Sequence, residues 1–412
     1  MAVQTEKEES IIVNRGISRK IEEGNDQRLL NILNGSLYAH PIKSAIRELV
    51  SNASDAIAEK RFAIDVIMGK KQISDKYIDR IDKDDPQYKH SNFDMEYYDI
   101  NWLDSNDQIT INYIEGMGIS GEIDIISIRD TGVGLSDKEG ISGKPRLIGI
   151  HNSLYSTKRN NHNSFGAFGL GAKSVIAIDS SYYIIETVYN GHKYRLKCWK
   201  YKMVSDIGPI NLSTGQKNKV VTWGDDVIYG EPTTSKNYTE FIIPSKIPQR
   251  EPYVNAIKEQ LLYMNNVKFY YTKLNEAKKE IPFIANKIYE SDNIIISSNS
   301  PYTKPHILII KDNIEVGQLQ HDDAICYGLI DFPTLEMENY GGQIGIKCHI
   351  RSTVKDEEGN EIVLKDGVQV VQSRESVIFN DITGQYLRKR INEDILKETS
   401  EYVSSKTKCH WR

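Results

Sequence analysis

The sequence predicts an α+β protein with two domains, and three of its features lead to this prediction. Residues 46–60 form an amphipathic helical segment with a continuous apolar stripe. A series of segments rich in tyrosine, isoleucine and valine follows, as is typical of β-strands. After about Pro282, shorter strand-like runs alternate with polar loops and end in a helix. We therefore expect a larger domain over residues 1–285 and a smaller one over residues 286–412.

The composition predicts a globular protein, and the N-terminus and cysteines predict a cytoplasmic one. Hydrophobic residues make up 39% of the chain and charged residues 26%, and no apolar run approaches the roughly 18 residues of a membrane span. The charged N-terminus does not fit a signal peptide, and the 4 cysteines lie far apart, which predicts reduced thiols. A net charge of −5 gives no support for nucleic acid as a partner.

The predicted helix carries a polar stripe opposite its apolar face. At roughly 100° per residue, Glu48, Asn52 and Asp55 fall within about 60° of one another. A solvated stripe is the simpler interpretation. However, asparagine is a poor helix former that competes for the backbone, and a purely solvated face favours glutamate, lysine or glutamine. Asn52 therefore indicates that its carboxamide has a use.

Charged, tyrosine-rich residues 65–107 show little periodicity, and we expect an exposed, partly helical insertion there. The strands expected in the larger domain, the first two as a hairpin or as neighbours, are 108–114, 122–129, 181–189, 193–203, 220–223 and 238–243. Residues 252–264 are expected to form a helix. The elements expected in the smaller domain are strands 306–310, 324–329, 343–350 and 368–371 and a closing helix 382–396.

Two glycine-bearing motifs follow the polar stripe in the sequence. In DTGVG, Asp130 ends an apolar strand, so its carboxylate can accept a hydrogen bond from an exocyclic amine, while Gly132 and Gly134 let a planar ring lie against the backbone. An Asp-Thr-Gly turn is common, and the motif alone is weak. The second motif, FGAFGLGAKS, contains three spaced glycines and then a lysine: Gly166, Gly169, Gly171 and Lys173.

The second motif is typical of a glycine-rich turn that leads into a helix, where backbone N–H groups bind polyphosphate. A flexible loop explains it equally well when it is taken alone. Thr239, in a later strand, is nearly uninformative by itself because threonine is a common β former. Two further sites have ordinary surface explanations, namely Lys158 after Ser-Thr and Arg374 within Ser-Arg-Glu.

Taken together and in order, these motifs make the chain resemble the GHKL superfamily of ATPases. That superfamily includes gyrase-type topoisomerases, heat-shock chaperones with this nucleotide fold, MutL proteins and sensor histidine kinases. The resemblance implies a Bergerat fold, in which an antiparallel or mixed sheet backs the helices that hold ATP, followed by a smaller transducer-like domain. The expected cofactors are ATP and Mg²⁺.

The resemblance also implies a role for each matching residue. Asn52 would be the Mg²⁺ ligand, and Glu48 would orient or deprotonate the attacking water. Asp55 would lie beside the nucleotide, Asp130 would bind the adenine amino group, and Thr239 would support that contact. The DTGVG glycines Gly132 and Gly134 would bind the nucleotide beside the adenine ring. The residues implied at the phosphates are the lid residues Gly166, Gly169, Gly171 and Lys173 and the catalytic cations Lys158 and Arg374.

The chain resembles most closely the rIIA lysis-inhibition proteins of T-even-like phages. The matching segments include SLYAHPIKSAIRELVSNASDA, GIHNSLYSTK, SFGAFGLGAKS and QSRES, in the same order. That family is much longer, which leaves functions of its C-terminal region open, and Tyr238 replaces the glycine that often precedes the strand threonine. The resemblance implies a host-cytoplasmic ATPase that dimerises when ATP is bound and has an unidentified protein partner.

Two other functions stay open at this point. A MutL-like or MORC-like ATP-gated DNA clamp would use the same site. A nucleotide-binding structural or interaction protein without hydrolysis is the rival from a different class, although the presence of Glu48 argues against it. His40 abuts Pro41, which argues against a histidine kinase. The chain has no room for the cleavage module of a topoisomerase.

Overall fold

The structure, a computed structural model, has an α+β fold with one large and one smaller mixed sheet. Two short two-stranded sheets follow along the chain. The residues that the structure describes are 17–20, 40–70, 99–117, 123–136, 146–150, 171–178, 180, 182–202, 221–228, 232–246, 250–273, 276–283, 286–298, 307–311, 314–319, 342–347, 353–355, 361–363, 368–370, 377–378, 381–390, 393, 397–398 and 401.

The large sheet contains nine strands in the order β1-β6-β5-β4-β7-β3-β2-β8-β9. Neighbouring strands run antiparallel, except that β2 and β8 run parallel. The strands are β1 (Ile17–Lys20), β2 (Ile109–Met117), β3 (Ile123–Asp130), β4 (Tyr182–Tyr189), β5 (His192–Lys202), β6 (Val221–Ile228), β7 (Tyr238–Lys246), β8 (Val267–Lys273) and β9 (Lys279–Glu280).

The longest helix, α2 (Pro41–Ile67), extends beyond both ends of the predicted helix 46–60. Pro41 occupies the first turn, where its missing N–H costs no hydrogen bond. At the other end Gly69 adopts φ +70°, while the N–H groups of Gly69 and Lys70 donate to the carbonyls of Val66 and Asp65. This left-handed glycine cap stops the helix. Apolar residues, including the buried Phe62 and Ala63, continue the helix past residue 60, so the sequence prediction ended too early.

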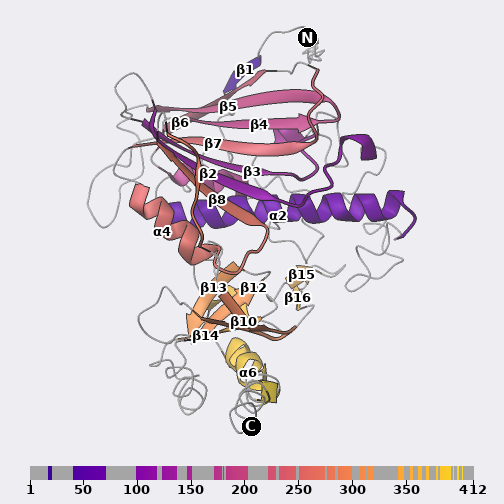
Figure 1. Cartoon of the computed structure of the whole chain (residues 1–412), viewed down its shortest axis with the longest axis vertical. Helices are drawn as coiled ribbons and strands as arrows, with labels where there is room; N and C mark the ends of the chain where they lie inside the picture. The colour runs from indigo at the N-terminus through magenta and orange to yellow at the C-terminus, as the bar shows by residue number, and fades with distance from the viewer. Residues whose placement is uncertain are drawn as a thin grey trace, which may run out of the picture.

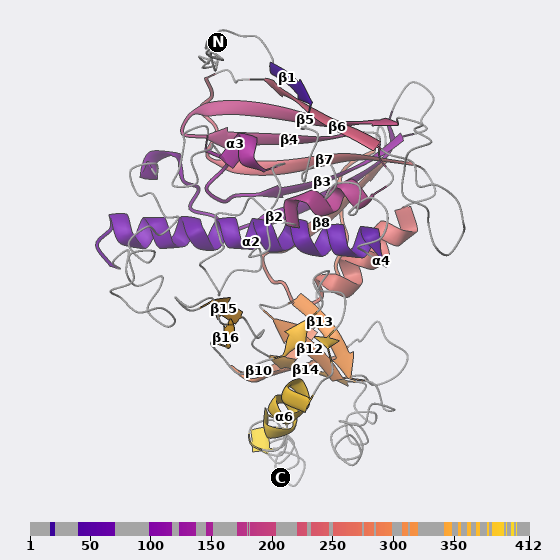
Figure 2. The ribbon, with the colours of Figure 1, turned by 180° about the vertical axis from the view of Figure 1, so that it is seen from behind.

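The helices of the larger part cover one face of the sheet. Figures 1 and 2 show α2, η4 (Gly171–Ala177) and α4 (Arg250–Gln260) on the same side, behind the sheet in the first view and in front of it in the second. Alternate strand residues, such as Ile111, Ile128 and Ile185, are buried on this face together with Ile46 of α2. Strand alternation and the apolar stripe of α2 therefore form one core.

The predicted strands of the large sheet lie within a few residues of the observed ones, and β2 pairs with β3 as a neighbour. The predicted helix 252–264 is α4, which begins at Arg250 and ends at Gln260. β8 was not predicted. Shorter elements η3 (Ile100–Trp102) and α3 (Arg146–Gly149) flank the sheet strands in the chain.

The second sheet contains five strands in the order β10-β11-β14-β12-β13 and shares no strand with the first. It lies beneath α2 and α4 in Figure 1, and helix α6 (Asp381–Arg390) lies farther along the same axis. The remaining strands are β10 (Asn286–Glu290), β11 (Ile294–Ser298), β12 (Ile307–Lys311), β13 (Ile314–Leu319), β14 (Gly342–Lys347), β15 (Thr353–Lys355), β16 (Glu361–Val363), β17 (Gln369–Val370) and β18 (Val377–Ile378).

The division into domains at residue 285 stays a prediction. The closing helix is shorter than the predicted 382–396, since α6 ends at Arg390. The predicted strand 324–329 lies outside the described residues, as does most of the expected insertion, residues 71–98. Within the described part of the chain, no helix is long and apolar enough to cross a membrane.

Candidate functional site

The polar stripe of α2 is not a solvated face. Glu48 is only 6% exposed, and Asn52 and Asp55 are half-buried. Among the described residues, none forms a hydrogen bond with the carboxamide of Asn52. Nε of the buried Arg47 lies 3.6 Å from Oε1 of Glu48, so a positive charge stands beside this carboxylate. Burying polar groups is costly unless they are hydrogen-bonded or paired with a charge. The stripe is therefore held by contacts within the protein rather than by water alone.

Sheet register places three more polar residues side by side. Asp130, the last residue of β3, lies opposite Thr239 of β7, and Thr239 lies opposite Thr187 of β4. Directly opposed residues share a face of the sheet, and all three side chains are buried, with Asp130 6% exposed. The predicted pair Asp130 and Thr239 is therefore brought together, and Thr187 joins it.

The hydroxyl groups of this row have defined roles. Thr187 Oγ1 donates to the carbonyl of Tyr238 at 2.7 Å and accepts from the N–H of Leu135 at 3.0 Å. Thr239 Oγ1 lies 3.3 Å from Thr187 Oγ1. Because a hydroxyl has one proton and Thr187 has already donated its own, Thr239 is the donor in this contact. The oxygen of Thr239 can then accept a hydrogen bond next to Asp130.

The loop after β3 lies directly against α2. A Cβ atom added to Gly132 would be 2.6 Å from Cβ of Ala56, so only glycine allows this approach. The N–H of Gly132 donates to Oδ1 of Asp130 at 2.8 Å, which orients the carboxylate. Ala56 follows Asn52 by one helical turn and is adjacent to Asp55. This contact therefore joins the stripe of α2 to the row on the sheet.

Gly134 fixes the other end of the same loop against β4. It adopts φ +78°, and an added Cβ would lie 2.3 Å from the carbonyl oxygen of Val188. The carboxamide of the buried Asn237 donates to the carbonyl of Val133 at 3.0 Å. The DTGVG glycines thus allow the loop to pass close to two elements at once.

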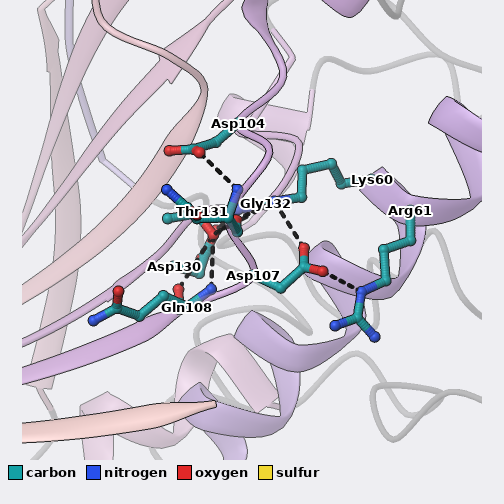
Figure 3. Close-up of polar contacts among 9 residues, drawn as sticks. Lys60, Arg61, Asp104, Asp107, Gln108, Asp130, Thr131 and Gly132 are labelled. Carbon is teal, nitrogen blue, oxygen red and sulfur yellow. Dashed lines mark hydrogen bonds and ion pairs between the residues drawn. The ribbon is translucent and has the colours of Figure 1, made fainter.

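A buried lysine at the end of the stripe links α2 to the same loop. Lys60 Nζ lies 2.9 Å from Oδ1 of Asp107, 2.6 Å from the carbonyl oxygen of Asn106 and 3.5 Å from Oγ1 of Thr131 (Figure 3). Thr131 Oγ1 also donates to the carbonyl of Asn106 at 2.6 Å and accepts from the N–H of Gln108 at 3.0 Å.

Asp107 is shared by two cations. Burial by itself would raise the pKa of this carboxyl, but the hydrogen bonds and charges of Lys60 and Arg61 outweigh burial and hold the pKa below its usual value. Arg61 reaches Asp107 from the solvent, with 62% of its side chain exposed, whereas the Lys60 side chain is 1% exposed. The carboxylate form of Asp107 is therefore favoured in the folded protein.

The third predicted glycine, Gly171, begins η4, which packs against α2. The sequence predicted the N-terminus of a helix here, but the segment is a 3₁₀ helix of 7 residues. Lys173 and Ser174 within it are buried, and a phosphate contact for Lys173 stays a prediction. Lys158, Gly166, Gly169 and Arg374 lie outside the described residues.

Sequence reasoning did not find Lys60, Thr131, Asp107 and Thr187. Lys60 had a usable signal, because Asn52, Ala56 and Lys60 recur at a spacing of four and lie on one side of a helix. Asp107 and Thr187 carried no such signal, since their positions depend on contacts between distant segments.

The described residues include no group of three or more His, Cys, Asp or Glu side chains that could hold a metal ion. Magnesium binding at Asn52 stays a prediction. Comparison of the chain with known protein families and with curated proteins found no match.

We expect Gly134→Ala to destabilise the protein more than Gly69→Ala, a matched control. Both glycines have a left-handed backbone, which costs other residues about 1–2 kcal/mol, but an added Cβ at Gly69 meets nothing within 4 Å. Gly134→Ala should therefore lose about 3 kcal/mol or more because of the added clash with Val188. Urea unfolding of both variants measures this, and equal losses would contradict the described loop geometry.

Asp107→Asn should lower the free energy of unfolding at pH 7 by about 1–3 kcal/mol, because Lys60 stays buried without its carboxylate. Since folding lowers the pKa of Asp107, its stabilising effect is complete well above 3.8, the value without neighbours, and is lost as the pH falls through the lower, folded pKa. Urea unfolding from pH 7 to pH 3 should show the difference from wild type shrinking at the acidic end. A constant difference would count against the ion pair.

Proposed function

We propose that the chain is a Bergerat-fold ATPase of the GHKL type, which binds ATP with Mg²⁺ and hydrolyses it slowly. The observation that carries this proposal is the contact of Gly132 with Ala56. Ala56 lies one residue after Asp55 and one helical turn after Asn52, while Gly132 follows Asp130, which the sheet register pairs with Thr239. Two segments that carry residues of the types implied by the resemblance therefore touch at this contact, which supports the proposal.

The row on the sheet suits recognition of adenine. The N–H of Gly132 orients the carboxylate of Asp130, and a carboxylate is the type of acceptor that an exocyclic amine requires. The hydroxyl oxygen of Thr239, whose proton goes to Thr187, can accept a hydrogen bond beside Asp130 on the neighbouring strand. A guanine base offers a carbonyl oxygen at the equivalent position, and Asp130 would repel it.

The stripe on α2 suits the phosphate end. The carboxamide oxygen of Asn52 is a hard ligand of the kind that Mg²⁺ prefers. Bound Mg²⁺ would neutralise charge that develops on the phosphates. Glu48, one turn earlier and held beside Arg47, would orient water and accept its proton. Positioning carries most of such catalysis, which accounts for slow turnover.

Glu48→Gln should retain ATP binding and lose about 10²–10⁴-fold in phosphate release, the usual contribution of a general base. Calorimetry measures binding, and a coupled phosphate assay measures turnover. Asp55→Asn on the same stripe is the matched control and should lose less turnover. Wild-type turnover in Glu48→Gln would remove Glu48 from the reaction. ATP binding without turnover in the wild type would favour the rival interaction protein.

Asp130→Asn should weaken ATP binding about tenfold to hundredfold, because it replaces a charged hydrogen-bond acceptor. The affected contact is present before and during the reaction, so turnover at saturating ATP should change less. Thr239→Val, which removes the neighbouring hydroxyl, should have a smaller effect. Titration calorimetry with ATP and GTP tests this. Equal wild-type affinity for the two nucleotides would contradict the assigned role of Asp130.

A further inference from the structure

Lys60 is the most deeply buried cation of the network in Figure 3. Burying an ammonium group costs several kcal/mol unless its partners compensate, and an apolar residue of similar size would fill the space without that cost. Lys60 contacts three partners instead, namely a carboxylate, a carbonyl and a hydroxyl. The arrangement is too specific to serve only as filling for the core.

The three partners belong to the segment that precedes β2 and to the loop that follows β3. Asn106 and Asp107 precede β2, and Thr131 directly follows Asp130 in the chain. The hydroxyl of Thr131 closes the network by contacting both the carbonyl of Asn106 and the N–H of Gln108. Any movement of Thr131 away from α2 would also move the backbone of Asp130 and the N–H of Gly132 that orients its carboxylate.

Arg61 shows what is special about Lys60. Arg61 also forms an ion pair with Asp107, so a second cation neutralises this carboxylate from the exposed side of the helix. Within the described residues, however, only Lys60 of these two cations also contacts Asn106 and Thr131. Charge neutralisation and loop anchoring are therefore separable by substitution.

We propose that Lys60 is a positioning residue that anchors the Asp130–Gly132 loop to α2 and thereby sets the selectivity of the site for a 6-amino purine. This inference rests on the proposed ATP site. In this proposal Lys60 acts through the loop and not by a contact of its own with the nucleotide. It acts by holding Asp130 at the depth and angle at which the carboxylate meets the exocyclic amine, and loss of the anchor should weaken that contact more than the contacts to phosphate.

The first experiment needs no nucleotide. Hydrogen–deuterium exchange is measured for the amides of residues 108–111 and 131–134 in wild type, Lys60→Met and the control Arg61→Met. Lys60→Met should speed exchange about tenfold or more at both segments, since their N–H groups depend on the anchored loop. Arg61→Met should change it less than about twofold. Unchanged exchange in Lys60→Met would overturn the anchoring role.

The second experiment compares the Kd values of ATP and inosine triphosphate, which lacks the 6-amino group, in the same three proteins. The wild type should prefer ATP by about tenfold to hundredfold. Lys60→Met should reduce that ratio toward the ratio of Asp130→Asn, while Arg61→Met should keep it. A ratio is informative because general loss of stability affects both ligands alike.

The outcomes separate the two claims. Faster exchange with an unchanged ratio would make Lys60 a structural residue and overturn the positioning role. No binding of either nucleotide by the wild type would overturn the proposed function, and with it the selectivity, while exchange still decides whether Lys60 anchors the loop. If Lys60→Met does not fold, Thr131→Val and Thr131→Ser replace it. The serine keeps the hydroxyl and should preserve the ratio, whereas the valine should lower it.

Discussion

The approach of Gly132 to Ala56 is the contact on which the rest of the site depends. A sheet and a helix ordinarily pack through layers of side chains, which keep polar groups on the two elements apart. Here the backbone after β3 touches α2 without an intervening side chain. The end of β3 that carries Asp130 therefore lies next to the helix that carries the stripe, and the N–H of Gly132 orients the Asp130 carboxylate at this contact.

The polar groups around this contact differ in how firmly their neighbours hold them. The row of Asp130, Thr239 and Thr187 is buried and directed by backbone donors and acceptors, which makes it rigid. Asn52, half-buried and uncommitted among the described residues, lies where a ligand can still approach. Rigid groups suit recognition of an unchanging base, whereas a less committed group suits a hydrated cation that exchanges its ligands.

Local patterns revealed the elements, but contacts between distant segments decided how they assemble. The stripe containing Glu48 and Asn52, and the position of Asp130 at a strand end, followed from periodicity in short windows. The order β4-β7-β3 did not, because pairing in a sheet is set by packing across the whole domain. β8 was missed because VKFYYTK follows closely after a helix, and Thr187 looked like any strand threonine. Lys60 was overlooked because a lysine near a helix end usually faces solvent.

The parallel pairing of β2 with β8 has a consequence for folding during synthesis on the ribosome. β2 begins at Ile109, yet its neighbour on one side does not exist until Lys273 has been synthesised. The packing of helix α2 is also incomplete until α4, which contacts it, has been synthesised. Until then a nascent chain exposes an open sheet edge and an apolar helix face, which invite association with other chains. This part of the sheet can therefore be completed only after β8 has been synthesised, and the long sequence separation of β2 and β8 predicts slow folding by the measure of contact order.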